Sequence, residues 1–222
     1  MTKVEYIKQK QLQAKSFRVA GIEIFIKDEV KENVSVRKVV EKLYSLIPRA
    51  LLLNVRSIHI GQFSELKSRN LQAMYENSTI FATNEQSSNE DLLDDLIHEV
   101  AHSVEELYSS FIYDDDQIKK EFLQKRKQMW ITLKGKGFEI ELEKFLNVKY
   151  VEDFDMFLYK EVGYPLLSSV VASLFYSPYA ATSLREYFAN GFESFFMNKD
   201  IGRLKNISPT LYKKISKLSM RS

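Results

Sequence analysis

The segment His98-Glu99-Val100-Ala101-His102 places two imidazoles and a carboxylate within five residues of this 222-residue chain. On an α-helix, residues four apart lie on the same face, so the ring nitrogens of His98 and His102 can reach one metal ion. Glu99 is turned by about 100° around the helix axis, toward a water molecule on that ion. The pattern H-E-x-x-H is typical of zinc peptidases, and it predicts two metal ligands and a general base.

The residues around this motif indicate the helix that would carry it. Asn89, Glu90 and Asp91 offer a cap and an acidic first turn. Apolar residues then recur at a spacing of three to four, at Leu92, Leu93, Leu96, Ile97, Val100, Ala101, Val104 and Leu107. The alternative is an ordinary amphipathic helix with two solvated histidines. We favour metal binding because a histidine pair beside such an apolar stripe is costly to leave without a partner.

A catalytic zinc ion needs a third protein ligand and keeps a fourth position for water. Glu105 and Glu106 are close in sequence, but ligands at 98, 102 and 106 of a straight helix would spread over roughly 12 Å. His59 is the only other histidine. It lies on a predicted strand and is better explained as a partly exposed strand residue. The third ligand is therefore expected from a different element, further along the chain.

The segment from Thr182 to Phe196 is the best source of that ligand. Thr182 or Ser183 can cap a helix whose apolar face would consist of Leu184, Tyr187, Phe188, Phe192, Phe195 and Phe196. Glu186, Asn190 and Glu193 fall together on another stripe of the same helix. A carboxylate beside so much aromatic surface is costly to desolvate unless a cation holds it. We predict Glu186 as the third ligand, and Glu161 or Glu193 are the alternatives.

Composition narrows the classes of partner. The 32 basic and 30 acidic side chains nearly cancel, so nothing argues for nucleic acid or a membrane as partner. The basic run Lys119, Lys120, Lys125, Arg126 and Lys127 has acidic neighbours, and we interpret it as a solvated helix face. Cysteine is absent, which excludes disulfides and a thiolate zinc site.

Terminal and apolar segments bear on localisation. Residues 1–15 lack the apolar core of a secretory signal, and residues 162–184 are too interrupted by prolines and serines to span a bilayer. We expect a protein that is cytoplasmic as synthesised. Secretion by a non-classical route, or from a leader outside this chain, is the alternative.

The elements that must position the motif follow from periodicity. Strands are predicted over 16–27, with a bulge at Gly21, over 55–63 and over 74–83, and a helix over 34–53 that ends near Pro48. We predict one α+β domain over residues 1–222, with an N-terminal arm at 1–15. It would have a small mixed β-sheet, an edge strand at 74–83 beside the histidine helix, and a mainly helical C-terminal half.

Further residues give the chain a resemblance to a known family. Tyr179 stands seven residues before Glu186, and Glu186-Tyr187-Phe188-Ala189 is followed by Phe192. With the histidine motif, this pattern resembles the metallopeptidase domain of anthrax lethal factor and the secreted clostridial Pro-Pro endopeptidases. Lys160-Glu161-Val162-Gly163 and Ser208-Pro209-Thr210-Leu211-Tyr212 add to the resemblance, which covers most of the chain from about Phe17.

The resemblance implies a zincin-like fold and hydrolysis of peptide bonds in a protein or peptide substrate. It implies that His98, His102 and Glu186 bind Zn²⁺. By the same resemblance Glu99 is the general base, and Tyr179 assists at the oxyanion that develops from the substrate carbonyl. The relatives are toxin-like proteins that act outside the producing cell.

Two departures from the family pattern affect this prediction. Asn190 stands where the family usually has an acidic residue, and an amide orients a histidine ligand without adding charge. Residues 114–151 form an enlarged, insertion-like region that contains the only tryptophan, Trp130. This region is expected either to shape a substrate groove or to dock a partner. The alternative function is a zincin-fold interaction domain with weak or no catalysis.

Overall fold

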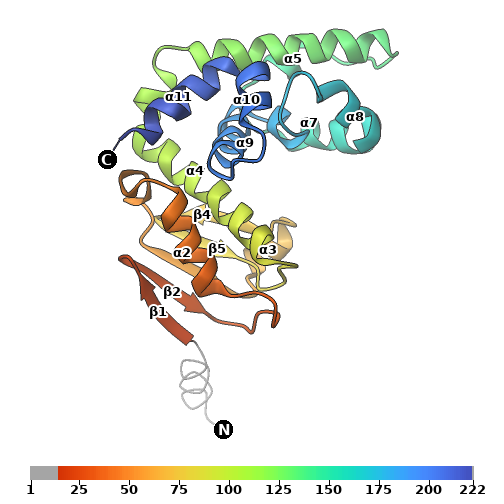
Figure 1. Ribbon diagram of the computed structural model, residues 1–222. Coiled ribbons are helices and arrows are strands. Elements are labelled where there is room, and N and C mark those ends of the chain that lie inside the picture. Colours follow the sequence, from red (N-terminus) through yellow and green to blue (C-terminus); the bar gives the residue numbers. More distant parts are fainter. Residues whose placement is uncertain (1–14, 222) are drawn as a thin grey trace. The chain divides into compact units, whose positions relative to one another are not determined.

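The computed structural model describes residues 15–221, which fall into two compact units (Figure 1). The first unit runs to Val104 and includes Arg221, and the second covers Glu105–Met220. The boundary lies inside α4 (Asn89–Tyr113), which is kinked further along at Tyr108. A single domain over residues 1–222 remains a prediction. The predicted N-terminal arm lies outside the described residues except for Lys15, which begins the first strand.

The first unit contains the strands of the described chain. They form a mixed five-stranded sheet of order β1-β2-β3-β5-β4. Strand β3 is parallel to β2 and β5, whereas β1 and β4 are antiparallel to their neighbours and lie at the two edges. The elements before α4 are β1 (Lys15–Val19), β2 (Ile22–Ile26), α2 (Val36–Leu46), η1 (Arg49–Leu52), β3 (Ser57–Ile60), α3 (Ser64–Ser68), β4 (Ala73–Glu76) and β5 (Thr79–Ala82). The α+β class and the mixed sheet are confirmed.

Two of the predicted strands are hairpins. Within 16–27, Ala20 and Gly21 both have positive φ, 48° and 102°, and they turn the chain from β1 into β2. The phase slip at Gly21 therefore marks a turn and not a bulge. Asn77 and Ser78, with φ of 49° and 63°, do the same between β4 and β5. Two successive positive φ angles are typical of type I′ turns, whose twist matches that of antiparallel strands.

Helices α2 and the first part of α4 lie against one face of the sheet (Figure 1). The predicted helix 34–53 is α2 and η1, separated at Pro48, which has no N–H to continue a helix. The side chains between these helices and the sheet are fully buried and include Ile24, Val40, Leu43, Ile58, Ile80, Leu92, Leu96, Ile97 and Val100. This core holds the predicted metal-site helix by its apolar stripe.

Helix α4 is capped one residue earlier than predicted. Ser88 Oγ accepts a hydrogen bond of 3.1 Å from the backbone N–H of Asp91. Asn89 instead accepts a hydrogen bond of 2.7 Å from the backbone N–H of Ser35, the residue before α2. The prediction of Asn89 as cap was wrong, because its side chain ties the start of α4 to the start of α2.

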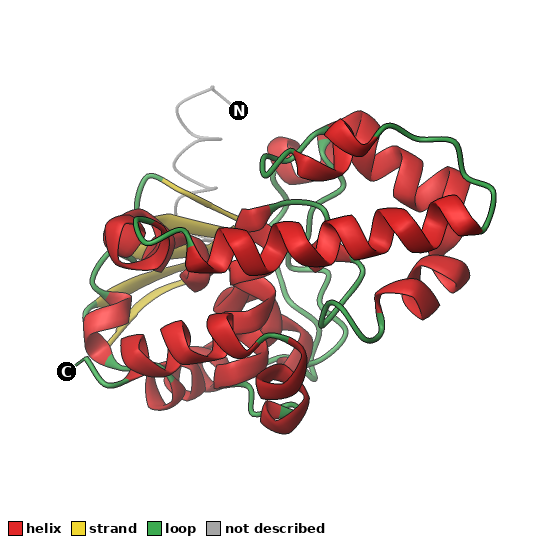
Figure 2. Cartoon of the chain, turned by 90° about the horizontal axis from the view of Figure 1, so that it is seen from above, coloured by secondary structure: helices red, strands yellow, loops and turns green. Residues whose placement is uncertain are grey.

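The second unit is drawn in Figure 2 as helices joined by loops, which confirms a mainly helical C-terminal half. Its elements after α4 are α5 (Gln117–Gly135), α6 (Leu142–Leu146), α7 (Glu152–Met156), the π-helical η2 (Phe157–Gly163), α8 (Tyr164–Val171), η3 (Tyr179–Ala181), α9 (Leu184–Phe196), α10 (Ile201–Ile207) and α11 (Pro209–Ser219). No helix within residues 15–221 is long and apolar enough to cross a membrane.

Helix α9 is central to this unit and packs against α5, α10, α11 and η3. Gly191 permits its close approach to α11, since a Cβ atom there would lie 2.3 Å from Cδ2 of Leu211.

The basic run on α5 is not a solvated face throughout. Lys125 and Arg126 are only 8% and 1% exposed, so the prediction was wrong for these two residues, which α5 turns into the core.

Candidate metal centre

His98, Glu99 and His102 come together on α4. One potential ligand atom from each residue lies within 4.8 Å of the other two. The two imidazole rings are 5.0 Å apart between centroids and nearly perpendicular, at 83°. Four-coordinate zinc holds its donor atoms roughly 3.4 Å apart, so small side-chain rotations would bring both rings onto one ion. Imidazole nitrogens and carboxylate oxygens are common metal ligands, so this group could hold a metal ion.

The cluster is sheltered from solvent. Glu99 and His102 are each 7% exposed, and His98 is half-buried. This agrees with the prediction that the histidines lie beside the apolar stripe of the helix. A carboxylate held out of bulk water beside two imidazoles is well placed to exchange a proton with a bound water molecule.

Asp95 adds a further carboxylate one turn before Glu99. Its Oδ2 accepts a hydrogen bond of 2.8 Å from Nε2 of the buried Gln86. Burial raises the pKa of Asp95 to about 6, the Gln86 hydrogen bond opposes the rise, and the nearby charge of Glu99 adds to it. Asp95 was not predicted from the sequence, although its position four residues before Glu99 on a helix was an available signal.

His59 lies in the sheet, as predicted. Its ring stacks between Phe25 and Phe81, with centroid distances of 4.7 and 5.3 Å. Its strand neighbours Ile58 and Ile60 are fully buried, so alternation along the strand directs His59 to the opposite face. Burial lowers the pKa of His59. The contacts with Phe25 and Phe81 explain His59 as a strand residue that packs between aromatic side chains of the neighbouring strands.

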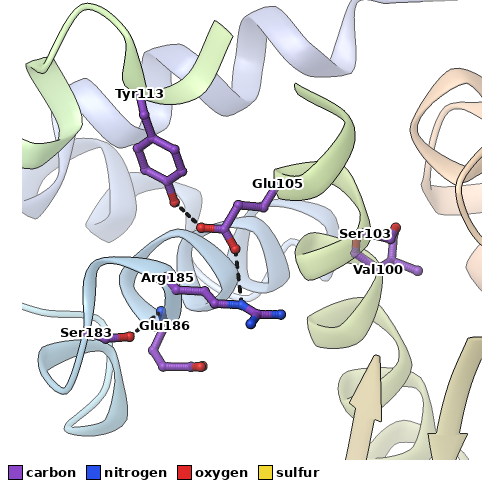
Figure 3. A network of polar contacts seen from close by, with 7 residues as sticks. All are labelled: Val100, Ser103, Glu105, Tyr113, Ser183, Arg185 and Glu186. Carbon is purple, nitrogen blue, oxygen red and sulfur yellow. Dashed lines mark hydrogen bonds and ion pairs between the residues drawn. The ribbon is translucent and has the colours of Figure 1, made fainter. Parts of the chain in front are cut away.

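Glu186 lies near the start of α9 and is 9% exposed. Its backbone N–H donates a hydrogen bond of 3.1 Å to Ser183 Oγ, which makes Ser183 the cap of the helix (Figure 3). A serine followed three residues later by a glutamate also matches the sequence pattern of a capping box, which is a structural reason for a glutamate at this position. Glu186 belongs to the second unit and the histidines to the first, so their meeting at one ion remains a prediction.

Tyr179 and Asn190 are linked through a short turn of the second unit. Tyr179 begins η3 and is 41% exposed, and its carbonyl accepts a hydrogen bond of 2.8 Å from Thr182 Oγ1. Asn190 is 7% exposed, and its Oδ1 accepts a hydrogen bond from Ser177 Oγ. Ser177 Oγ in turn accepts one of 3.2 Å from Ala180 N–H. Asn190 thus supports the turn that carries Tyr179, and its contact with a histidine stays a prediction.

Glu105 has partners that were not predicted from the sequence. Its carboxylate accepts a hydrogen bond from the hydroxyl of Tyr113 and lies 3.3 Å from Nε of Arg185 (Figure 3). Burial raises the pKa of Tyr113 well above its ordinary value, and the charge of Glu105 adds to the rise. The continuation of α4 beyond His102 is therefore joined to the residue that precedes Glu186.

The alternative third ligands have different surroundings. Glu193 lies 3.4 Å from Nζ of Lys199. Glu161 is exposed at the surface of η2. Glu186 is the most buried of the three candidate carboxylates.

Comparisons with protein-family models, with curated proteins and with solved structures found no match. The fold therefore defines the chain as an α+β protein with a five-stranded mixed sheet and an H-E-x-x-H cluster on its long helix. The zincin-like fold and the resemblance to the lethal factor family remain predictions from the sequence.

Proposed function

We propose that this protein is a zinc-dependent endopeptidase. The proposal is carried by the cluster of His98, Glu99 and His102, whose potential ligand atoms lie within 4.8 Å of one another on one sheltered helix. Metal-assisted hydrolysis requires nitrogen ligands for the ion and a carboxylate that can move a proton beside it. This cluster supplies both within a single element of the first unit.

In this proposal His98, His102 and Glu186 hold the ion. The burial of Glu186 supports its role, because a carboxylate at 9% exposure needs hydrogen bonds or a cation. The contact between Glu105 and Arg185 supports it further, since it joins the chain three residues after His102 to the residue before Glu186. Zinc bound there supplies a Lewis acid and lowers the pKa of water toward neutrality.

In this proposal Glu99 and Tyr179 have different roles in the hydrolysis. Glu99 accepts a proton from the attacking water and passes it to the leaving amine. The Tyr179 hydroxyl donates a hydrogen bond to the oxygen that becomes negatively charged as the carbonyl is attacked. Strand β4, at an edge of the sheet, offers backbone groups with which an extended peptide pairs.

Metal analysis together with cleavage of a diverse peptide library tests the proposal. We expect about one zinc ion per chain and zinc-dependent cleavage in the wild type. Glu99→Gln should keep the zinc and lose cleavage by roughly 100-fold or more. The matched control is Glu90→Gln, which changes an exposed carboxylate in the first turn of the same helix and should leave both properties unchanged. Full activity in Glu99→Gln would exclude its role as base.

A second candidate function is an interaction domain that binds zinc without turnover. Asn190 favours it, because this uncharged residue already accepts a hydrogen bond from Ser177 and adds no negative charge that would make a histidine ligand more basic. Stoichiometric zinc with no cleavage of any library member would support this alternative and exclude the peptidase.

A further inference from the structure

Arg126 is the largest of the fully buried side chains in the described part of the chain. It lies on α5 within the 114–151 region and is 1% exposed. Among the described residues no carboxylate pairs with it. Burial lowers the pKa of Arg126 to about 9, so the guanidinium still carries its charge at neutral pH.

The guanidinium lies among carbonyl oxygens and the rings of Phe122, Phe145 and Phe154. Nη1 donates hydrogen bonds to the carbonyls of Ala181 and Thr182, the latter at 3.2 Å. Nη2 donates one of 2.8 Å to the carbonyl of Lys144 on α6. The ring of Phe154 covers the group, with its centroid 4.0 Å from Cζ. Nε is buried without a partner, so the site is not optimised for the charge itself.

Burying a charge in this way is costly, and an apolar side chain of similar volume would fill the same space more cheaply. An apolar side chain lacks the planar guanidinium group, which can donate hydrogen bonds to several carbonyl oxygens at once. Two of those carbonyls close η3 and precede the Ser183 cap of α9. Both therefore lie within the eight-residue segment Tyr179–Glu186.

We propose that Arg126 is a positioning residue that fixes the Tyr179–Glu186 segment from within the 114–151 region. This inference rests on the proposed function, in which Tyr179 stabilises the oxyanion and Glu186 binds zinc. It gives the enlarged region a specific task, which is to brace the turn between those two side chains. Trp130 contributes to the same region by donating a hydrogen bond of 2.9 Å to the carbonyl of Ile140.

The neighbouring residue provides a matched control. Lys125 is also buried, at 8% exposure, and also donates to a backbone carbonyl, that of Ile207 at 2.5 Å. Its second acceptor is Ser208 Oγ at 2.6 Å. Lys125 therefore binds the chain where α10 ends and α11 begins. Lys125 also lies over the rings of Phe175 and Tyr187, which flank the Tyr179–Glu186 segment. Lys125→Met therefore removes a buried cation next in sequence that donates no hydrogen bond to that segment.

The experiment compares Arg126→Met, Arg126→Lys and Lys125→Met in the full chain. Amide hydrogen exchange is measured at 179–186 and at 204–215, with zinc affinity, kcat and KM on a cleaved peptide. Both Arg126 variants should exchange at least about tenfold faster at 179–186 and unchanged at 204–215. Their zinc affinity should fall by about tenfold or more, and kcat should fall more than KM rises. Lys125→Met should show the opposite exchange pattern with normal zinc affinity.

Unchanged exchange at 179–186 would overturn the inference. Loss of protection throughout the second unit in both Arg126 variants would also overturn it, because Arg126 would then support the core in general. A third outcome would separate the two proposals. If the wild type binds zinc, and if the Arg126 variants exchange faster at 179–186 but keep normal zinc affinity and kcat, the inference is refuted and the proposed function stands. A folded wild type with neither zinc nor cleavage would refute the proposed function, and with it the catalytic meaning of Arg126.

Discussion

Nε of Arg185 lies 3.3 Å from Oε2 of Glu105, and the other oxygen of that carboxylate accepts a hydrogen bond from the Tyr113 hydroxyl (Figure 3). The two contacts differ in environment. The Arg185 side chain is 54% exposed, so its ion pair is screened by solvent and contributes at most about 1 kcal/mol. The Tyr113 hydroxyl is sheltered, and a hydrogen bond to a charged group in such a place contributes about 1.5–3 kcal/mol.

We therefore expect Tyr113→Phe to lower the free energy of unfolding by about 2 kcal/mol, and Arg185→Ala by less than about 1 kcal/mol. Urea denaturation of the metal-free protein measures both values. Glu105→Gln keeps the shape of the side chain but removes its charge, and it should weaken both contacts together. If Arg185→Ala proved more damaging than Tyr113→Phe, this ranking of the two contacts would be wrong.

The identity of the third zinc ligand can be tested without disturbing the helix that carries it. The cap of α9 uses the backbone N–H of residue 186 as donor to Ser183 Oγ, so Glu186→Gln preserves the start of the helix and removes only the anionic ligand. We expect its zinc affinity to fall by more than about 100-fold, beyond the loss typical of an outer-shell residue. Glu193→Gln and Glu161→Gln should bind zinc normally. Competition with a chromogenic chelator measures all three.

A normal zinc affinity in Glu186→Gln would remove residue 186 from the ligand set. A large loss in Glu193→Gln instead would transfer the role to the carboxylate that lies 3.4 Å from Lys199. In either case the His98 and His102 assignment would stand, because those residues cluster within the first unit.

Local periodicity was enough to predict the helix at the centre of the site. The apolar spacing from Leu92 to Val104 determines which face is buried, and the histidine spacing places His98 and His102 on a neighbouring face. Alternation likewise identified His59 as a strand residue. Both signals work because the residues that decide the structure are only a few positions apart.

Features that depend on distant acceptors could not be predicted in this way. Charge counting assigned Arg126 to a solvated face, but its acceptors include carbonyls 55 and 56 residues further along the chain. Backbone oxygens have no sequence signature, so nothing in the local pattern marked this burial. The hairpin turn at Asn77 and Ser78 was missed because strand-forming residues lie close on both sides of it, at Tyr75 and from Thr79 to Phe81, and because the turn lacks a glycine. The third ligand depends on the arrangement of two units, which local spacing does not encode.

Tyr179→Phe tests the oxyanion role separately from metal binding. Loss of one hydrogen-bond donor to a developing oxyanion typically lowers kcat by about 100- to 1,000-fold, and we expect a fall in this range with little change in KM. Zinc content should not change, and stability should change by less than about 0.5 kcal/mol because the side chain is 41% exposed. Tyr176→Phe is the control in the same segment, and should leave kcat unaltered. Unchanged turnover in Tyr179→Phe would reduce Tyr179 to a packing residue.

Asp95 predicts a dependence of stability on pH in the metal-free protein. Burial raises its pKa from an ordinary value of 3.8 to about 6 in the folded state. Because the folded-state pKa lies above the unfolded one, the charged carboxylate destabilises the folded protein above pH 6, and this penalty disappears as the pH falls toward 4. Asp95→Asn should therefore raise the free energy of unfolding at pH 7.5 by about 2–3 kcal/mol and leave it unchanged below pH 4.

Urea titrations of wild type and Asp95→Asn across this pH range measure the difference. The asparagine can still accept the hydrogen bond from Gln86, so the comparison isolates the charge. Saturating zinc should reduce the difference at pH 7.5, because a cation held by His98, one turn along the same helix, favours the charged carboxylate. A difference that is the same at pH 4 and pH 7.5 would show that the Asp95 carboxylate is not destabilised by burial. A difference insensitive to zinc would argue against a cation at His98.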